Sequence, residues 1–188
     1  MTFAHQVRRY AVAPFVGPHS VHGYYGELMD NSATATNAAW PAANRAMYYP
    51  LILPEPCTAY RFFWVNGTTV GTHNFQMGLY NDNDAGDDGP GTSIVLGNQT
   101  LSAGASACQF DDITDTPLPA GRLWIALWGS GTTPSLFRHA PSSTLARHMC
   151  GMGQASLTGG LPATATPVSV GTLTTYIAVC GFTTIPSP

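Results

Sequence analysis

Four aspartates lie close together in one short polar stretch of the chain: Asp82, Asp84, Asp87 and Asp88. Convergent carboxylate oxygens are the ligands that Ca²⁺ prefers. The spacing is not that of an EF-hand loop, because Gly86 stands at the fifth position counted from Asp82 and no Glu stands at the twelfth. A solvated hairpin tip therefore explains the stretch better than a calcium site, and we assign no metal ligand.

A second acidic stretch contains Asp111, Asp112 and Asp115. One of its first two carboxylates, together with one from the first loop, would supply the pair that glycosidases use. Any two acidic loops satisfy that description, so the pattern does not predict an enzyme. The histidines form no metal-binding pair, and no nucleophile-elbow or phosphate-loop motif accompanies them: His5, His19, His22, His73, His139 and His148. We expect no catalytic residue and no cofactor.

The four cysteines, Cys57, Cys108, Cys150 and Cys180, are widely spaced and form no Cys-x-x-Cys pair. No zinc site or redox motif is therefore predicted. Cys108 and Cys180 stand in strand-like surroundings and are expected to be small buried hydrophobic residues. Disulfide bonds remain an alternative.

Several aromatic residues occupy predicted strands, and flat aromatic faces are the surfaces on which sugar rings stack. Because alternate strand residues face a core, core packing is the expected role, and an exposed pair would favour sugar binding instead. The residues concerned are Tyr60, Trp64, Tyr80, Trp124 and Trp128.

The elements that position these residues are strands. Phe75, Met77 and Leu79 alternate with other residues at the period of two that is typical of a strand with one face on a core. Asn81 to Gly91 is expected to be a loop, and Thr92 to Leu96 resumes an apolar strand. The segment therefore predicts a hairpin with the acidic loop at its tip.

Leu118 to Arg122 predicts a turn that leads into the strongest strand, Leu123 to Trp128. Large residues occupy both faces of this strand. We therefore expect it in the middle of a sheet, between a core and either a second layer or a neighbouring subunit.

Further strands are expected before and after this region: Arg45 to Leu53, Thr58 to Val65, Ser135 to His139, and Gly171 to Thr184 with its continuous apolar core from Tyr176 to Phe182. Pro50 favours an edge position or a bulge, and Asn66-Gly67 predicts a chain reversal leading to the hairpin. Gly129 to Pro134 is expected to be a loop. Ala140 to Pro167 shows no period and predicts weak strands or a surface loop used for contacts.

Seven or eight strands and no amphipathic helix predict an all-β fold, an antiparallel β-sandwich of jelly-roll type, over residues 44–188. Residues 1–43 are rich in Pro, Gly and single aromatics and are interpreted as an extended N-terminal arm. Two alternatives remain open for this arm: it crosses to a neighbouring copy, or it packs back on its own sandwich.

The central strands carry a resemblance. The order of an apolar strand, Gly78-Leu-Tyr-Asn-Asp-Asn83, Gly89-Pro-Gly-Thr92, a second strand and Leu118-Pro-Ala-Gly-Arg-Leu-Trp-Ile-Ala-Leu127 resembles a β-sandwich module of bacteriophage tail-fibre and other virion-surface proteins. The likeness covers roughly residues 44–138 and consists of strands and turns, not of catalytic residues. The acidic loop is longer than in the module, and the arm has no counterpart in it.

Composition points to an assembled protein. Charged residues make up 9% of the chain and lysine is absent, whereas ordinary globular proteins carry about 25% charged residues. Few charges suit a subunit that lies within a larger assembly. The net charge of −3 and the scattered arginines argue against nucleic-acid binding. We find no convincing signal peptide and no apolar stretch long enough to span a membrane.

Together these observations predict a multimeric structural protein of a bacteriophage virion, assembled in the host cytoplasm, and the resemblance favours the tail or fibre apparatus. Its expected partners are copies of itself and other virion proteins. Two alternatives remain open: a head decoration, or cement, protein, and a carbohydrate-binding module that recognises host glycans.

Overall fold

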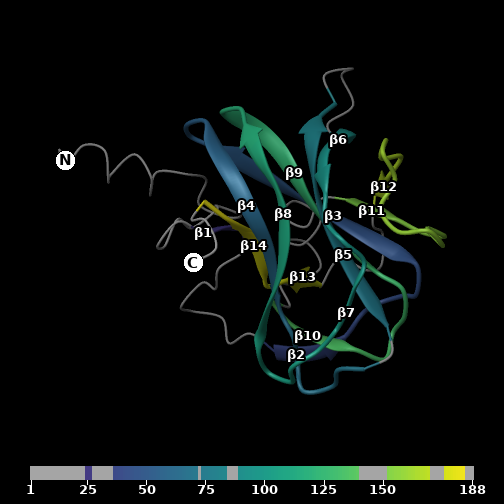
Figure 1. Ribbon diagram of the computed structural model, residues 1–188. Helices are drawn as coiled ribbons and strands as arrows, with labels where there is room; N and C mark the ends of the chain where they lie inside the picture. Colours follow the sequence, from purple (N-terminus) through teal and green to yellow (C-terminus); the bar gives the residue numbers. More distant parts are fainter. Residues whose placement is uncertain are drawn as a thin grey trace.

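The computed structural model describes residues 24–26, 36–71, 73–83, 89–139, 152–169 and 176–184. These residues form strands and loops without a helix, and every strand pairing among them is antiparallel (Figure 1). The expected all-β antiparallel sandwich is therefore confirmed.

Two large sheets face each other, and a small sheet closes one end. The first, here called the β4 sheet, has the order β1 (Tyr24–Gly26), β14 (Cys180–Thr183), β4 (Cys57–Val65) and β8 (Cys108–Leu118). The second, the β9 sheet, has the order β12 (Val168–Ser169), β11 (Met152–Gln154), β3 (Arg45–Leu53), β9 (Gly121–Gly129), β5 (Asn74–Asp82) and β6 (Pro90–Leu96), with β7 (Thr100–Leu101) also paired to β5. The small sheet has the order β13 (Ile177–Ala178), β10 (Ser135–His139) and β2 (Thr36–Ala39).

Strand β9 lies between β3 and β5, as its apolar residues on both faces predict. Leu123, Ile125 and Leu127 enter the main core between the two large sheets. Trp124 and Trp128 enter a second apolar cluster on the opposite face of the β9 sheet. The alternation of residues along β9 therefore predicted correctly which of them share a face of the sheet.

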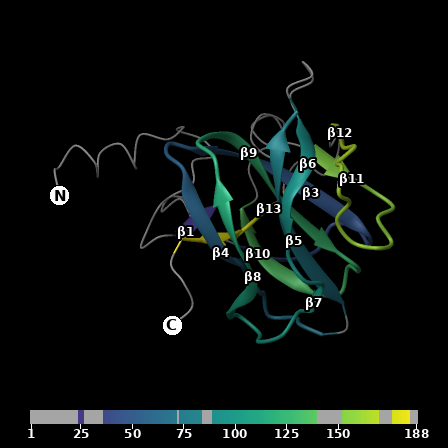
Figure 2. The same ribbon diagram turned by 45° about the horizontal axis from the view of Figure 1, so that its top comes forward.

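Residues 152–165, here called the strap, cover that opposite face (Figure 2). Leu157 and Leu161 of the strap pack in the second cluster. The indole Nε1 of Trp128 donates to the Leu157 carbonyl at 2.9 Å, and the Tyr80 hydroxyl donates to the Pro162 carbonyl at 2.6 Å. The second layer beside β9 is therefore part of the same chain, and a neighbouring subunit is not what covers it.

Asn66-Gly67, where the sequence predicts a chain reversal leading to the β5–β6 hairpin, follows β4 directly. The strands on either side of this segment, β4 and β5, belong to different sheets, and Asn66 forms an isolated bridge with Leu136. The expected strand from Tyr176 to Phe182 is two strands, because the chain changes sheets at Val179 between β13 and β14. Alternation predicts the faces of a strand but not its neighbours.

The described parts of the N-terminal region pack on this sandwich. Strand β1 pairs with β14, and β2 pairs with β10. Trp40 is buried in the main core with its ring edge-on to Phe75 at 5.7 Å between ring centres. For residues 24–26 and 36–40 the second alternative, packing back on the same chain, therefore holds. The remainder of the predicted arm lies outside the described residues.

One of the two expected loops is shorter than predicted. Strand β5 continues through Asp82 and β6 begins at Pro90, so the loop between them is shorter than residues 81–91. The other, Gly129 to Pro134, is a loop as expected and connects β9 to β10. It is held at both ends, because Ser130 exchanges hydrogen bonds with Asn74 and the Pro134 carbonyl accepts from the Trp40 amide at 3.1 Å. Strand β11 pairs only with Ala46 to Tyr48 of β3. At Pro50, among the described residues, β3 therefore pairs with β9 on one side and has no strand on the other. This agrees with the expected edge position.

Candidate functional site

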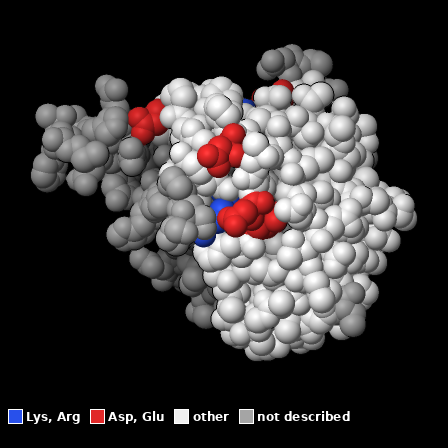
Figure 3. Space-filling model, viewed as in Figure 1, with Lys and Arg blue, Asp and Glu red and all other residues white. Residues whose placement is uncertain are grey.

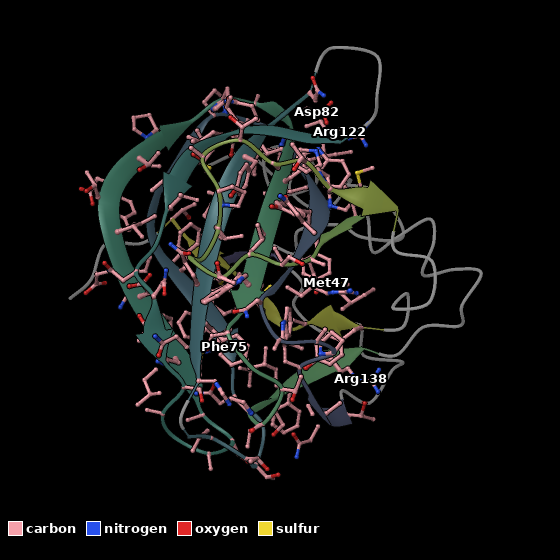
Figure 4. All side chains as sticks on the ribbon, turned by 90° about the vertical axis from the view of Figure 1, so that its right-hand side faces the viewer. Met47, Phe75, Asp82, Arg122 and Arg138 are labelled. Atoms are coloured by element: carbon pink, nitrogen blue, oxygen red, sulfur yellow. The ribbon has the colours of Figure 1, made fainter. Side chains whose placement is uncertain are left out.

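Asp82, the one aspartate of the acidic loop among the described residues, is held at the base of that loop. Its Oδ1 accepts a hydrogen bond from Trp124 Nε1 at 2.6 Å and lies 3.5 Å from Arg122 Nε. The Arg122 guanidinium also lies 5.1 Å from the centre of the Trp124 ring. Figure 4 shows Asp82 and Arg122 side by side at one end of the sandwich, away from Phe75 and Arg138.

These contacts make Asp82 a structural residue that anchors the end of β5. Its engaged oxygen is already shared by an indole and a guanidinium, which is the opposite of the convergent oxygens that Ca²⁺ requires. Asp84, Asp87 and Asp88 lie outside the described residues. In the part of the chain that the structure describes, no group of three or more His, Cys, Asp or Glu is placed to hold a metal ion.

Asp111 is buried and is fully used by a neighbouring loop. Its Oδ2 accepts from the Asn98 amide at 2.7 Å, and its Oδ1 accepts from Asn98 Nδ2 at 2.8 Å. The Gly97 amide next to Asn98 in turn donates to the Met77 carbonyl at 2.8 Å. Asp111 therefore ties the loop after β6 to β8, and the Gly97 amide ties the same loop to β5.

This geometry keeps the two predicted acidic positions apart. Asp82 lies five residues beyond Met77 along β5, which corresponds to about 17 Å in a strand. Glycosidase carboxylates are separated by roughly 5–10 Å. Asp112 follows Asp111 in β8 and pairs with Arg61, with Nε and Oδ1 3.8 Å apart. Asp82 therefore does not form that pair with Asp111 or Asp112.

The aromatic residues considered for sugar stacking are mostly core residues. Trp64, Tyr80, Trp124 and Trp128 are each at most 2% exposed, and Tyr60 is half-buried. Tyr48 and Tyr80 pack edge-on, with 5.4 Å between ring centres, beneath the strap. The prediction of core packing is confirmed for the four buried residues. Burial raises the pKa of the Tyr48 and Tyr80 hydroxyls well above the ordinary value for tyrosine.

The cysteines follow the prediction only in part. Cys180 is buried as expected, but Cys108 is exposed, because it begins β8 on the side of the strand that faces away from the core. No disulfide joins Cys57, Cys108 and Cys180, and Cys150 lies outside the described residues. Burial, with a smaller contribution from Glu55, raises the pKa of the Cys57 thiol to about 11, so it is not an activated nucleophile.

Sequence reasoning missed two buried amide side chains, those of Asn66 and Gln76, that tie loops to the strands. Asn66 is fully buried; its Oδ1 accepts from Trp64 Nε1 at 3.1 Å, and its Nδ2 donates to the Ala103 carbonyl at 2.7 Å and to Gln109 Oε1 at 2.9 Å. Gln76 similarly joins β5 to the strap, because its Oε1 accepts from the Leu161 amide at 2.7 Å. Their only sequence signal was a polar residue within or beside an apolar strand.

The described surface carries few charges, and Figure 3 shows that most of the face toward the viewer is neither acidic nor basic. Large apolar side chains are exposed at separate places: Ile52 by 44%, Leu101 by 50% and Phe110 by 39%. The described residues contain no helix long and apolar enough to cross a membrane.

The sequence was compared with protein-family models and with curated proteins. No protein-family model matches the chain, and no curated protein matches its sequence.

Proposed function

We propose that the chain is a non-enzymatic structural component of a bacteriophage virion, a multimeric β-sandwich of the tail or fibre apparatus. One observation carries the proposal: the described side chains singled out for chemistry are engaged in holding the fold. Asp82 anchors a strand end, Asp111 anchors a loop, and the tryptophans fill the two apolar clusters. A protein organised in this way acts through its surfaces.

The proposed mechanism is the burial of weakly charged faces between neighbouring subunits. The strap supports this proposal, because it contains no charged residue and its Leu157 and Leu161 pack over the β9 sheet. A neutral surface loses little hydration energy when a partner covers it, whereas each charge removed from water is costly unless it is paired. Copies of the chain and other virion proteins are the proposed partners.

The resemblance of residues 44–138 to the virion-surface module favours a position in the tail or fibre. A head decoration protein is the second candidate, and it is favoured by the lack of any helix in the described residues, which leaves them without a coiled-coil shaft. The glycan-binding alternative has weaker support, because four of its five candidate aromatic residues are buried.

The proposal is tested on intact particles of the virus that encodes the chain. Mass spectrometry of purified particles is expected to detect the chain in many copies, and an electron cryomicroscopy map is expected to show sandwich density in symmetric positions on the tail or head. Purified particles that lack the chain would overturn the proposal. Hydrolysis of a polysaccharide by the purified chain would overturn its non-enzymatic part.

A further inference from the structure

Asn66 and Gly67 form the only Asn-Gly pair in the sequence. In such a pair the glycine nitrogen can attack the side-chain amide carbon of the asparagine, because glycine has no side chain to hinder the approach and its backbone turns freely. A bond forms between these two atoms, the side-chain nitrogen leaves as ammonia with the glycine proton, and a five-membered succinimide results. Water then opens the ring at either carbonyl group, which leaves aspartate or its main-chain isomer, isoaspartate.

The folded structure engages both reacting groups. The Gly67 amide donates to the Ser135 carbonyl at 2.7 Å, which holds its nitrogen in another contact. The Asn66 side chain is fully buried, and the three hydrogen bonds described above fix both ends of its amide. Succinimide formation in the folded chain therefore requires these bonds to open first.

The packing around position 67 requires glycine. A Cβ atom at this position would collide with the side chains of Asn37 and Ser135. These two residues belong to β2 and β10, which pair with each other in the small sheet. A larger residue at position 67, which would slow the reaction, would therefore displace strands of the sandwich.

The hydrogen bonds around position 66 require an amide. Nδ2 of Asn66 donates to the Ala103 carbonyl at 2.7 Å and to Gln109 Oε1 at 2.9 Å, so a carboxylate oxygen in its place would face two acceptors. The Gln109 amide is itself fixed, because its Oε1 accepts from the Ala103 amide at 3.0 Å and its Nε2 donates to the Leu101 carbonyl at 2.8 Å. A buried charge that faces acceptors is costly, so aspartate at position 66 opposes folding.

Isoaspartate would disturb the backbone as well. It lengthens the main chain by one atom between the Asn66 amide, which donates to the Ala107 carbonyl at 2.9 Å, and the Gly67 amide, which donates to the Ser135 carbonyl at 2.7 Å. Both products of the reaction therefore conflict with the contacts that the folded chain makes at this point.

We propose that Asn66-Gly67 is a modification site of the unfolded chain alone. Deamidation there converts unfolded chains into aspartate and isoaspartate forms that do not return to the folded state, whereas folding prevents the reaction. Because the fold requires both residues, the pair limits the time for which an unfolded chain remains able to fold. This inference does not depend on the proposed role in a virion.

The protection is tested by incubating the full chain at neutral pH, either folded in buffer or unfolded in guanidinium chloride, and following each asparagine by peptide mass spectrometry. Asn66 is expected to deamidate at least about tenfold faster in the unfolded chain, because the reaction in the folded chain requires buried bonds to open. Asn81 and Asn98 are internal controls, since larger residues follow them, and both are expected to react more slowly than Asn66 in denaturant. Equal rates at Asn66 in the two states would overturn the proposal.

A refolding step tests the consequence. After denaturant is removed and size-exclusion chromatography has isolated the folded chain, the deamidated fraction at Asn66 is expected to be at least about fivefold lower than before refolding, because the product places acceptors against acceptors. An Asn66→Asp variant is expected to show no cooperative thermal transition by circular dichroism, whereas Asn81→Asp, at an exposed position, is expected to unfold like the original chain. Deamidated chains that enter the folded fraction as readily as intact ones, or an Asn66→Asp variant with an unchanged transition, would show that the proposal is wrong.

Discussion

Asn66 is a residue at which three buried polar contacts converge. It follows β4 directly and bonds Trp64, Ala103 and Gln109 from a fully buried position. Low local polarity strengthens such satisfied contacts and makes each unpaired group costly. At the residue scale, stability therefore depends on a few buried amides as well as on the aromatic core.

Replacing Asn66 by alanine is expected to lower the free energy of unfolding by about 2–4 kcal/mol, because it leaves the Trp64 indole N–H and the Ala103 carbonyl without this partner. Urea unfolding followed by tryptophan fluorescence measures the change. Asn81→Ala is the matched control, since Asn81 is exposed and makes only a long 3.4 Å contact with Thr92; its effect is expected to stay within about 0.5 kcal/mol. Equal effects of the two changes would contradict the role given to Asn66.

Cys57 is expected to make stability fall in alkaline solution. Its folded-state pKa is raised to about 11, above the ordinary thiol value of about 8.5, so the unfolded state releases its proton first. The stability contribution is complete below about pH 8.5 and is lost as the pH rises toward 11. Unfolding free energies measured from pH 7 to 11 are expected to fall less in Cys57→Ala than in the original chain. Parallel pH profiles would refute the assignment.

At the scale of elements, the strap is the part of the fold that the sequence described least well. Its irregular backbone is held by the Trp128 indole and the Gln76 amide of the sheet below it and by the Gln99 amide of the loop after β6. Leu157 and Leu161 supply its apolar contacts. Hydrogen bonds to the strap backbone replace the strand pairing that its Gly and Pro residues do not favour.

Leu161→Ala is expected to destabilise the strap by about 2–3 kcal/mol, because the shortened side chain leaves a cavity against the second cluster. Hydrogen–deuterium exchange of residues 152–165 should accelerate more than that of β9 if the strap opens as a local unit. Thr158→Ala, at an exposed strap position, is the control and should leave exchange unchanged. Equal acceleration in β9 and the strap would show that they open together.

At the scale of the whole molecule, the sandwich begins before residue 44, where the sequence predicts its start. Trp40 lies before the predicted domain start at residue 44, yet it contacts Phe75 and Tyr176 in the main core. Residues 36–39 also form part of the small sheet. The sandwich therefore includes residues that composition alone assigned to an arm.

Trp40→Ala is expected to lower the free energy of unfolding by about 3–5 kcal/mol, as for other large core residues. Deletion of residues 1–43 removes both Trp40 and β2, and it is expected to give protein with an earlier thermal transition or no cooperative transition at all. Differential scanning calorimetry measures both effects. If the deletion variant has an unchanged transition temperature, the sandwich begins at residue 44, as the sequence predicts.

Taken by itself, the sequence determined the fold class, most strand positions and the division of β9 into two apolar faces, because side-chain alternation is a local property. Tertiary structure alone decided which strands are neighbours: β4 and β5 lie in different sheets, and the chain changes sheets at Val179. It also decided that Asp82 and Asp111 serve as anchors and that the strap covers Trp128. These outcomes depend on contacts between residues far apart in the chain, which no local pattern of residue types encodes.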